Sequence, residues 1–395
     1  MLPLLQGIRI LDFTTIVLGP YATQTLGDLG ADVIKIEPLQ GDLFRAVRPG
    51  RSRSMGAGFM GFNRNKRSLA IDLKRAESRA VLKRLVASAD AVVHNMRPKA
   101  AESLGIGYAQ LQAIRPDLVY AFAAGYDQSG PNANEPAYDD IIQAAAGVAA
   151  LNANAAGEPR YLSTILCDKV GGLHLAIAVA TALAYRARTG LGSCIEAPMF
   201  ESTVAFLMSE QLGGETFVPA LGPTGYDRLA APNRKPYATS DGYMAILPYN
   251  SVHWAAFFEL IGRPELAHSP QVQDPVLRSQ NVDALYAVIA EVAPTRTTAE
   301  WQSCLRAADI PCARVNSVGD LLHDAHLQAT EFFREFDHPT EGRMRGTRPP
   351  FRWHGGEERD DRPVPGPGTD GRDVLQEAGL TDRELDALLA DGVIG

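Results

Sequence analysis

The first 200 residues alternate short apolar strand patterns with amphipathic helix patterns, and this alternation restricts the possible folds more than any other feature of the chain. The patterns predict strands over 8–13, 32–37, 68–73, 90–94 and 118–123. They predict helices over 21–29 and 77–87. Strands that are joined through helices pair in parallel within one sheet. The chain is therefore expected to be an α/β protein, with a mostly parallel sheet and helices on both faces.

The pattern changes after about residue 212. Residues 213–236 are rich in Gly and Pro, which is typical of a linker. A hairpin over 237–249 and helices over 254–261, 282–292 and 298–307 are then predicted. These elements indicate a smaller α+β domain. Residues 340–370 have the composition of a loop, and Thr381 with Glu384 forms the capping box of a last helix.

Charge and cysteine usage restrict the class of protein. The 395 residues carry a formal charge of −8, which argues against general nucleic-acid binding. The four cysteines show neither disulfide nor metal spacing, which suits a reducing compartment. The first residues do not read as a signal peptide, and the longest apolar run, 173–185, is too short to span a bilayer. We expect a soluble cytoplasmic protein that binds neither nucleic acid nor a membrane.

Motifs for common cofactors do not fit. The GxGxxG match at 366–371 follows no predicted strand, so it does not indicate a dinucleotide site. The chain has no GxxxxGK[ST] loop and no GxSxG elbow. His323 and His326 lack a third ligand at metal spacing. No metal is therefore expected.

Basic residues cluster in two neighbouring segments of this acidic chain. They are Arg45, Arg48, Arg51 and Arg53, followed by Arg64, Lys66 and Arg67. A local positive field of this kind is able to receive a phosphate-bearing ligand. A solvated basic face fits the pattern equally well. The sequence leaves both interpretations open.

Asp168 lies at the start of a long apolar helix, and two interpretations share this placement. An Asp at a helix start commonly caps free backbone N–H groups. The same position favours the ionised carboxylate, which is able to act as a covalent nucleophile. Neighbouring N–H groups would then stabilise the oxyanion that forms on an attacked carbonyl. Spacing does not separate the cap from the nucleophile.

Polar residues also follow two predicted strands directly. Asn95 and Arg97 follow the strand over 90–94, and Tyr126 follows the strand over 118–123. Open α/β sheets bind ligands at the carboxyl ends of their strands. A guanidinium such as that of Arg97 holds phosphate or carboxylate through a bidentate fork.

Long stretches in matching order carry a resemblance to a known family. They include GIRILDFTTIVLGPYATQTLGDLGADVIKIEP, NRNKRSLAIDLK, VVHNMRPKAAESLGIGYAQLQAIRPDLVYAFAAGYDQSGP, CDKVGGLHLAIAVATALAYRARTGLG and GRDVLQEAGLTDRELDALLADGVIG. The chain resembles the family III CoA-transferases, the CaiB/BaiF family, which includes formyl-CoA transferase and carnitine CoA-transferase. The similarity extends over nearly the whole chain.

The resemblance implies a fold and an assembly. It implies a large Rossmann-like domain from residues 1–212 and 328–395, with a smaller inserted domain over 225–327 and a linker over 213–224. It also implies an interlocked homodimer in which each chain threads the ring of the other.

The resemblance also implies a reaction. Asp168 would attack an acyl-CoA thioester to form an acyl-aspartyl anhydride, and CoA thiolate would attack that anhydride in turn. An aspartyl-CoA thioester can follow before CoA reaches a free carboxylic acid. CoA is then a substrate, and no permanently bound cofactor is required. By similarity, CoA is expected to contact Val17, Leu18, Leu73, Lys74, Asn95, Met96, Arg97, Gly125 and Tyr126.

The chain departs from formyl-CoA transferase at several positions. It has Val17 in place of a Gln, Ala124 in place of a Lys and Ser103 in place of an Arg, and residues 213–236 hold no clear glycine-rich lid loop. These departures count against formyl-CoA and oxalate as substrates. The acyl donor and the acceptor acid stay open.

Two alternatives share the fold or the ligand. The related α-methylacyl-CoA racemases carry a His-Asp pair where this chain has Tyr138 and Asp139. A Tyr, with a reference pKa near 10, is a poor base near neutrality, so this position favours the transferase. A non-catalytic CoA-binding protein is the other alternative, and the presence of Asp168 in its helix-start motif counts against it.

Overall fold

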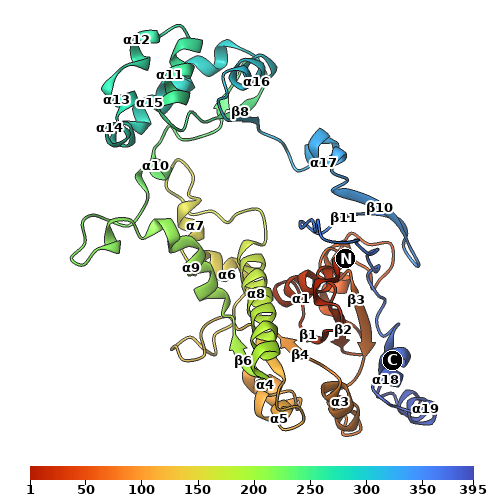
Figure 1. Cartoon of the computed structure of the whole chain (residues 1–395). Helices are drawn as coiled ribbons and strands as arrows, with labels where there is room; N and C mark the ends of the chain where they lie inside the picture. Colours follow the sequence, from red (N-terminus) through yellow and green to blue (C-terminus); the bar gives the residue numbers. More distant parts are fainter. The chain divides into compact units, whose positions relative to one another are not determined.

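The computed structural model describes all residues, 1–395, and the chain divides into two compact units (Figure 1). The first unit combines Met1–Leu207 with Phe332–Gly395, and the second is Met208–Glu331. The predicted linker over 213–224 falls within the second unit. Part of it, Gly213–Thr216, is a short 3₁₀ helix.

The first unit is built on one six-stranded parallel sheet, as predicted. Its strands are β1 (Arg9–Phe13), β2 (Asp32–Glu37), β3 (Lys66–Ala70), β4 (Ala91–His94), β5 (Val119–Phe122) and β6 (Ser193–Glu196). Their order in the sheet is β3-β2-β1-β4-β5-β6. The chain builds outward from β1 in one direction and then returns to add β4 on its other side. The direction of winding therefore reverses between β1 and β4, which is where open α/β sheets bind ligands.

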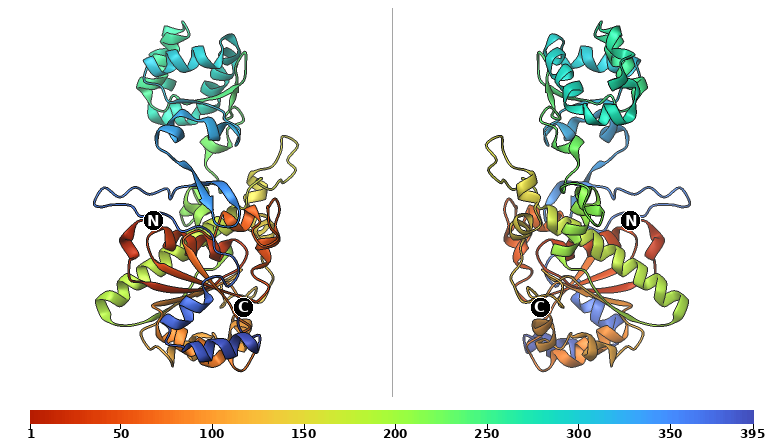
Figure 2. Two further views of the ribbon diagram at one scale, coloured as in Figure 1. Left: turned by 90° about the vertical axis from the view of Figure 1, so that its right-hand side faces the viewer. Right: turned by 90° about the vertical axis from the view of Figure 1, so that its left-hand side faces the viewer.

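Helices cover both faces of this sheet, which confirms the α/β prediction. Those of the first unit are α1 (Leu18–Asp28), α2 (Ala57–Met60), α3 (Ser78–Ala87), α4 (Pro98–Ser103), α5 (Tyr108–Gln112), α6 (Asp139–Ala145), α7 (Val148–Leu151), α8 (Leu166–Thr189), α18 (Gly371–Glu377) and α19 (Asp382–Ala390); α9 (Met199–Gln211) also starts there. Successive strand residues enter opposite cores because side chains alternate along a strand. Leu11 and Val92 pack with α3, α18 and α19, whereas Ile10 and Val93 pack with α1 and α8. Helices α18 and α19 lie on one face of the sheet and α8 on the other (Figure 2).

Helix α8 is longer than its predicted apolar run. It spans 24 residues, so by length and composition it is able to cross a membrane, contrary to our expectation. Half of its most apolar window is buried inside the fold, and Leu175 and Val179 are fully buried there. A core helix passes the same length test, so this length is only weak evidence for a membrane span.

The C-terminal part returns to the first unit. Its hairpin of β10 (Phe333–His338) and β11 (Gly342–Thr347) is antiparallel, so the prediction of a loop from 340 was wrong for β11. The apolar signal is missing because charged residues such as Arg343 and Arg345 occupy β11. The capping box of Thr381 and Glu384 before α19 is confirmed.

The second unit is a small α+β fold. Strands β7 (Tyr237–Ala238), β8 (Tyr243–Ile246) and β9 (Cys312–Arg314) form an antiparallel sheet, which confirms the hairpin. Its helices are α10 (Asp227–Ala230), α11 (Ser251–Leu260), α12 (Pro264–Ala267), α13 (Pro270–Gln273), α14 (Pro275–Gln280), α15 (Val282–Val292), α16 (Thr298–Ala307) and α17 (Ala325–Ala329). Trp254, Phe257 and Trp301 are buried at its centre.

Candidate active site

The loops at the carboxyl edge of the parallel sheet hold all nine residues predicted to contact CoA. Val17 and Leu18 follow β1, Leu73 and Lys74 follow β3, Asn95–Arg97 follow β4, and Gly125 and Tyr126 follow β5. Parallel strands end at one edge, so these loops lie along the same side of the sheet. The loops after β1 and β4 flank the point where the strand order reverses.

Asn95 joins those two loops. Its Oδ1 accepts a hydrogen bond from the Thr15 backbone N–H, and its Nδ2 donates to the Thr15 carbonyl, both at 2.9 Å. The amide therefore fixes the loop after β4 to the turn after β1. The two loops are thus already joined at the point where the strand order reverses, and the side chain of Asn95 is engaged in that link.

The turn between β1 and α1 is held in an unusual conformation. Ile16 has φ 71°, a left-handed conformation that costs a non-glycine residue on the order of 1–3 kcal/mol. Buried groups hold it in place: the Lys35 Nζ donates to the Thr14 carbonyl at 2.8 Å and pairs with Asp42 at 2.9 Å. The side chains of Val17 and Leu18 are buried, so a ligand at this turn meets mainly backbone.

Two cations remain available at this edge. Lys74 and Arg97 are exposed, and neither side chain has a hydrogen bond or an ion pair. Leu73 and Met96 pack in part against the core. The arrangement suits an anionic ligand whose phosphates are held by exposed charges and whose remainder follows the loop backbones.

The predicted basic cluster does not form one surface. Arg45 pairs with Glu37 at 2.6 Å, Arg64 with Asp28 at 2.5 Å, Lys66 with Asp12 at 3.0 Å, and Arg67 with Asp32 at 2.6 Å. Arg48 and Arg51 donate to backbone carbonyls. Both interpretations of the cluster were therefore wrong for the four ion-paired residues, because acidic partners compensate their charges.

Asp168 occupies the first turn of α8 but does not cap it. The carboxylate of Asp139, the first residue of α6, takes that place: its Oδ1 accepts from the backbone N–H groups of Cys167 at 2.7 Å and Asp168 at 3.2 Å. The cap interpretation of Asp168 was therefore wrong. Its own carboxylate makes no hydrogen bond and is left available.

Two glycines bring this turn of α8 against α1. A Cβ at Gly172 would lie 2.6 Å from the Leu18 carbonyl oxygen, and one at Gly171 would lie 2.9 Å from the Leu18 Cδ1. Only glycine permits this close approach. On the other side, Gly125 lies against Ala137, two residues before the Asp139 cap. Close contacts thus link the first turns of α8 to the start of α1, and the loop after β5 to the segment before α6.

The pKa of Asp168 is raised to about 7, first by burial and then by the neighbouring Asp139 carboxylate. The field of the helix N-terminus acts in the opposite direction and favours ionisation. Burial outweighs this field, because no hydrogen-bond donor reaches the carboxylate. Burial also raises the pKa of Cys167 to about 11, so this neighbouring thiol is neutral at physiological pH.

One predicted side chain has a different role in the structure, and one side chain that shapes the site was not predicted. Tyr126 is buried, with its ring 5.4 Å from that of Phe200, so its side chain belongs to the core. His94 was missed: its Nδ1 accepts from the Met96 N–H at 3.1 Å, and its Nε2 lies 2.6 Å from the Tyr120 hydroxyl. Burial lowers the pKa of His94 to about 4, so it holds the loop after β4 as a neutral group. A polar residue ending an apolar strand was its only sequence signal.

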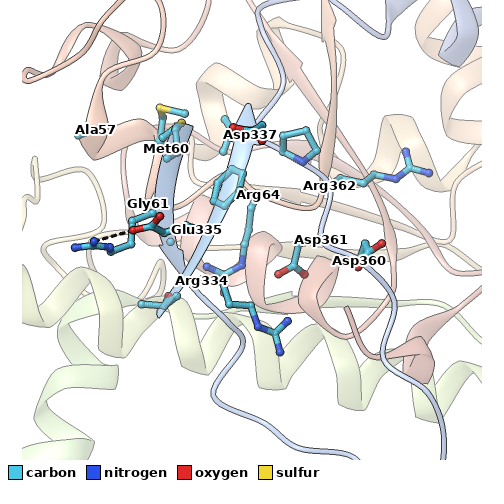
Figure 3. Close-up of a pocket in the computed structure, with 17 residues that line it drawn as sticks. Ala57, Met60, Gly61, Arg64, Arg334, Glu335, Asp337, Asp360, Asp361 and Arg362 are labelled. Carbon is cyan, nitrogen blue, oxygen red and sulfur yellow. Dashed lines mark hydrogen bonds and ion pairs between the residues drawn. The ribbon is translucent and has the colours of Figure 1, made fainter. Parts of the chain in front are cut away.

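A large cavity of the first unit lies elsewhere. It has a volume of about 590 Å³ and is formed by α2, the β10–β11 hairpin and residues 360–364 (Figure 3). Its wall carries Arg64, Arg334, Arg345 and Arg362 beside Glu335, Asp337, Asp360 and Asp361. These charges balance, and none of the predicted site residues lines the cavity. Its chemistry therefore does not single out an anionic ligand.

The chain belongs to CoA-transferase family III, whose family model matches residues 5–371. The resemblance noted from sequence motifs is thereby confirmed. The family is consistent with the reversal point of the sheet, its exposed cations and the available carboxylate at the start of α8.

Named relatives and a solved structure agree with this assignment. The succinyl-CoA:glutarate CoA-transferase of Mus musculus is 31% identical over 99% of this chain and 90% of its own. The acetyl-CoA:oxalate CoA-transferase of Acetobacter aceti is 34% identical, over 82% and 83%. The crystal structure of Rv3272 from Mycobacterium tuberculosis matches with a TM-score of 0.81 and 29% identity, over 93% of this chain and 98% of that one.

Proposed function

We propose that this protein moves CoA between an acyl-CoA thioester and a free carboxylic acid through covalent intermediates on Asp168. Its family and its named relatives support CoA transfer. The proposed role of Asp168 is supported by one observation: at the start of α8 a different carboxylate, that of Asp139, accepts the backbone N–H groups. Asp139 satisfies the helix N–H groups, and the carboxylate of Asp168 keeps both oxygens free for attack.

The proposed reaction conserves charge at every step. A carboxylate oxygen of Asp168 bonds to the thioester carbon, the C–S bond breaks, and CoA leaves as thiolate with the electron pair. The thiolate then attacks the aspartyl carbonyl of the anhydride, which releases the donor acid and leaves an aspartyl-CoA thioester. The acceptor carboxylate attacks that thioester, which expels CoA thiolate and forms an anhydride between the acceptor acid and Asp168. The thiolate then attacks the acceptor's carbonyl carbon, which gives the new acyl-CoA and frees the Asp168 carboxylate. No proton transfer and no permanently bound cofactor is needed.

The structure changes one expectation about transition-state stabilisation. Backbone N–H groups near Asp168 were expected to stabilise an oxyanion, but those of Cys167 and Asp168 already donate to Asp139. Their contribution is therefore to position the nucleophile. Binding of CoA is assigned to the loops after β1, β3, β4 and β5, with the charges of Lys74 and Arg97 opposite its phosphates.

The printed names of the relatives guide the choice of substrates. They include succinyl-CoA and acetyl-CoA as donors, and glutarate and oxalate as acceptors. We propose succinyl-CoA as the donor and a small carboxylic acid as the acceptor. We also propose a cytoplasmic location and an interlocked homodimer on the family resemblance. Light scattering after size exclusion tests the dimer.

The racemase alternative finds no support in the geometry of its key positions. Tyr138 is 69% exposed, and Asp139 is engaged with the backbone of α8 and with Gln143. Neither is placed as one of two opposed groups that exchange a proton at Cα. A non-catalytic CoA-binding role would leave Asp168 unmodified by every acyl-CoA.

Mass spectrometry of trapped adducts tests the proposal. The protein is mixed with succinyl-CoA, acetyl-CoA or a 2-methylacyl-CoA, each with hydroxylamine, and its peptides are analysed. We expect a hydroxamate on Asp168 and none in Asp168→Asn. Deuterium uptake at Cα of the 2-methylacyl-CoA in heavy water, without an adduct, would instead establish the racemase. Neither signal, despite CoA binding, would favour the non-catalytic role.

A further inference from the structure

Asp139 and Gln143 of α6 hold the N-terminus of α8, and the segment before it, through hydrogen bonds. Besides accepting the two N–H groups of α8, Asp139 accepts from the Gln143 Nε2 through its Oδ2 at 2.5 Å. The Oε1 of the buried Gln143 accepts from the Leu162 N–H at 2.9 Å. Two adjacent side chains of α6 thus hold both the segment that enters α8 and the backbone of Asp168 itself.

This fastening places a second negative charge beside the nucleophile. Asp139 forms no ion pair, and it is the charged neighbour that raises the pKa of Asp168. The Lys169 ammonium donates instead to the Thr164 hydroxyl at 2.7 Å. A helix start can be capped equally well by a neutral Ser, Thr or Asn. The charge of Asp139 is therefore not required by the capping geometry.

The other groups packed around the start of α8 do not offset this charge. Helix α1 presents Leu18 and Tyr21 to Gly171 and Gly172. Near the ends of β6 and α9, two acidic groups are engaged with backbone N–H groups of the loop after β5: Glu196 with Gln128 and Glu201 with Asp127. The thiol of Cys167 is neutral at physiological pH because burial raises its pKa. The carboxylates of Asp139 and Asp168 therefore both lie at the first turn of α8, where the one cation, Lys169, is engaged with Thr164 instead.

We propose that Asp139 is a positioning residue that also drives acylation of Asp168, because its charge repels the free carboxylate and no longer does so once Asp168 is acylated. The inference rests on the proposed function. When the C–O bond to the acyl group forms and the C–S bond breaks, the negative charge leaves with the CoA thiolate. Asp168 becomes neutral, and the repulsion from Asp139 is relieved. The same repulsion that opposes ionisation of Asp168 thus favours its covalent intermediates.

Three variants separate charge from geometry. Asp139→Asn keeps an oxygen that accepts both N–H groups but removes the charge, together with the second oxygen, which accepts from the Gln143 Nε2. Asp139→Ala removes the cap as well. Asp140→Asn removes the charge of the next residue in α6, which is exposed and makes no hydrogen bond through its side chain, and serves as the matched control. Hydroxamate formation on Asp168 from succinyl-CoA or acetyl-CoA with hydroxylamine is measured from pH 5 to 9, and circular dichroism confirms folding.

For Asp139→Asn we expect the acid limb of the profile to move down by about one pH unit, since a like charge in contact shifts a carboxyl by this order. We expect the plateau above pH 8 to fall about tenfold, which is the effect of one pKa unit on an equilibrium. In Asp139→Ala, hydroxamate formation should fall further than in Asp139→Asn at every pH. In Asp140→Asn it should match the wild type.

Two outcomes overturn the inference while leaving the proposed function intact. An Asp139→Asn profile that superimposes on that of the wild type would show that the charge has no effect. A loss in Asp139→Asn equal to that in Asp139→Ala, without displacement of the acid limb, would show that Asp139 is only structural. Absence of the hydroxamate from the wild type itself would instead overturn both proposals.

Discussion

Replacing Asp168 by Asn is expected to stabilise the protein at alkaline pH while it abolishes transfer. The pKa of this carboxyl is raised from 3.8 to about 7 in the folded chain, mainly by burial. At 1.36 kcal/mol per pKa unit the full shift corresponds to about 4 kcal/mol. Water reaches part of the side chain and screens its charge, so we expect about 1–2 kcal/mol of stabilisation.

The pH dependence follows from the direction of the shift. Below pH 4 the carboxyl is protonated in both the folded and the unfolded chain, so its ionisation imposes no penalty. Between pH 4 and 7 the unfolded chain releases the proton more readily, and the wild type loses stability as the pH rises. Above pH 7 the penalty is complete. The advantage of Asp168→Asn therefore appears across this window.

Thermal unfolding at pH 8.5 and pH 5 measures the effect. We expect Asp168→Asn to raise Tm by about 2–8 °C at pH 8.5, at roughly 2–4 °C per kcal/mol for a unit of this size. The gain should shrink to less than half at pH 5. Asp140→Asn is the control: its carboxylate is exposed, so no gain is expected at either pH. A gain that is absent at pH 8.5, or equal at both pH values, would refute a buried carboxylate without a donor at the start of α8.

Three further substitutions test the loops after β1 and β4 and the packing of α8 on α1. Arg97→Ala should raise the KM for acyl-CoA about tenfold with kcat unchanged, as expected when a phosphate contact made equally in ground and transition states is lost; a fall in kcat alone would contradict this. Lys35→Met should lower the free energy of unfolding in urea by about 3–5 kcal/mol, because the buried Asp42 carboxylate loses its partner; a change below about 1 kcal/mol would argue against the buried pair. Gly172→Ala should cost about 1–3 kcal/mol and reduce transfer, because its Cβ would meet the Leu18 carbonyl; unaltered unfolding and activity would contradict the close packing of α8 on α1.

Much of the fold was predictable because the central strands are buried on both faces. The strand over 32–37 was predicted with its observed limits, because Val33, Ile34 and Ile36 carry its apolar pattern. The capping box of Thr381 and Glu384 was equally predictable from the sequence, since both partners lie within one helical turn. Strand β11 was missed because arginines occupy it and its pairing with β10 leaves no apolar period.

The candidate site was predictable only in part. The predicted strand ends located the loops after β1, β3, β4 and β5. The role of each side chain in these loops, however, depends on partners that are distant in sequence. The Asn95 amide binds the backbone of Thr15, 80 residues away in sequence, and Lys66 pairs with Asp12 across 54 residues. No local pattern encodes such pairings.

Short-range periodicity was enough to predict the class of fold, the helix that carries Asp168 and the sheet edge at which we propose that CoA binds. The tertiary structure alone decided what Asp168 is able to do. Its position predicted a cap and a nucleophile equally well. Asp139, 29 residues earlier, occupies the capping site, and the carboxylate of Asp168 is left without a hydrogen-bond partner. A carboxylate is available for chemistry only when another group has satisfied the backbone around it, and that depends on which helix ends the fold brings together.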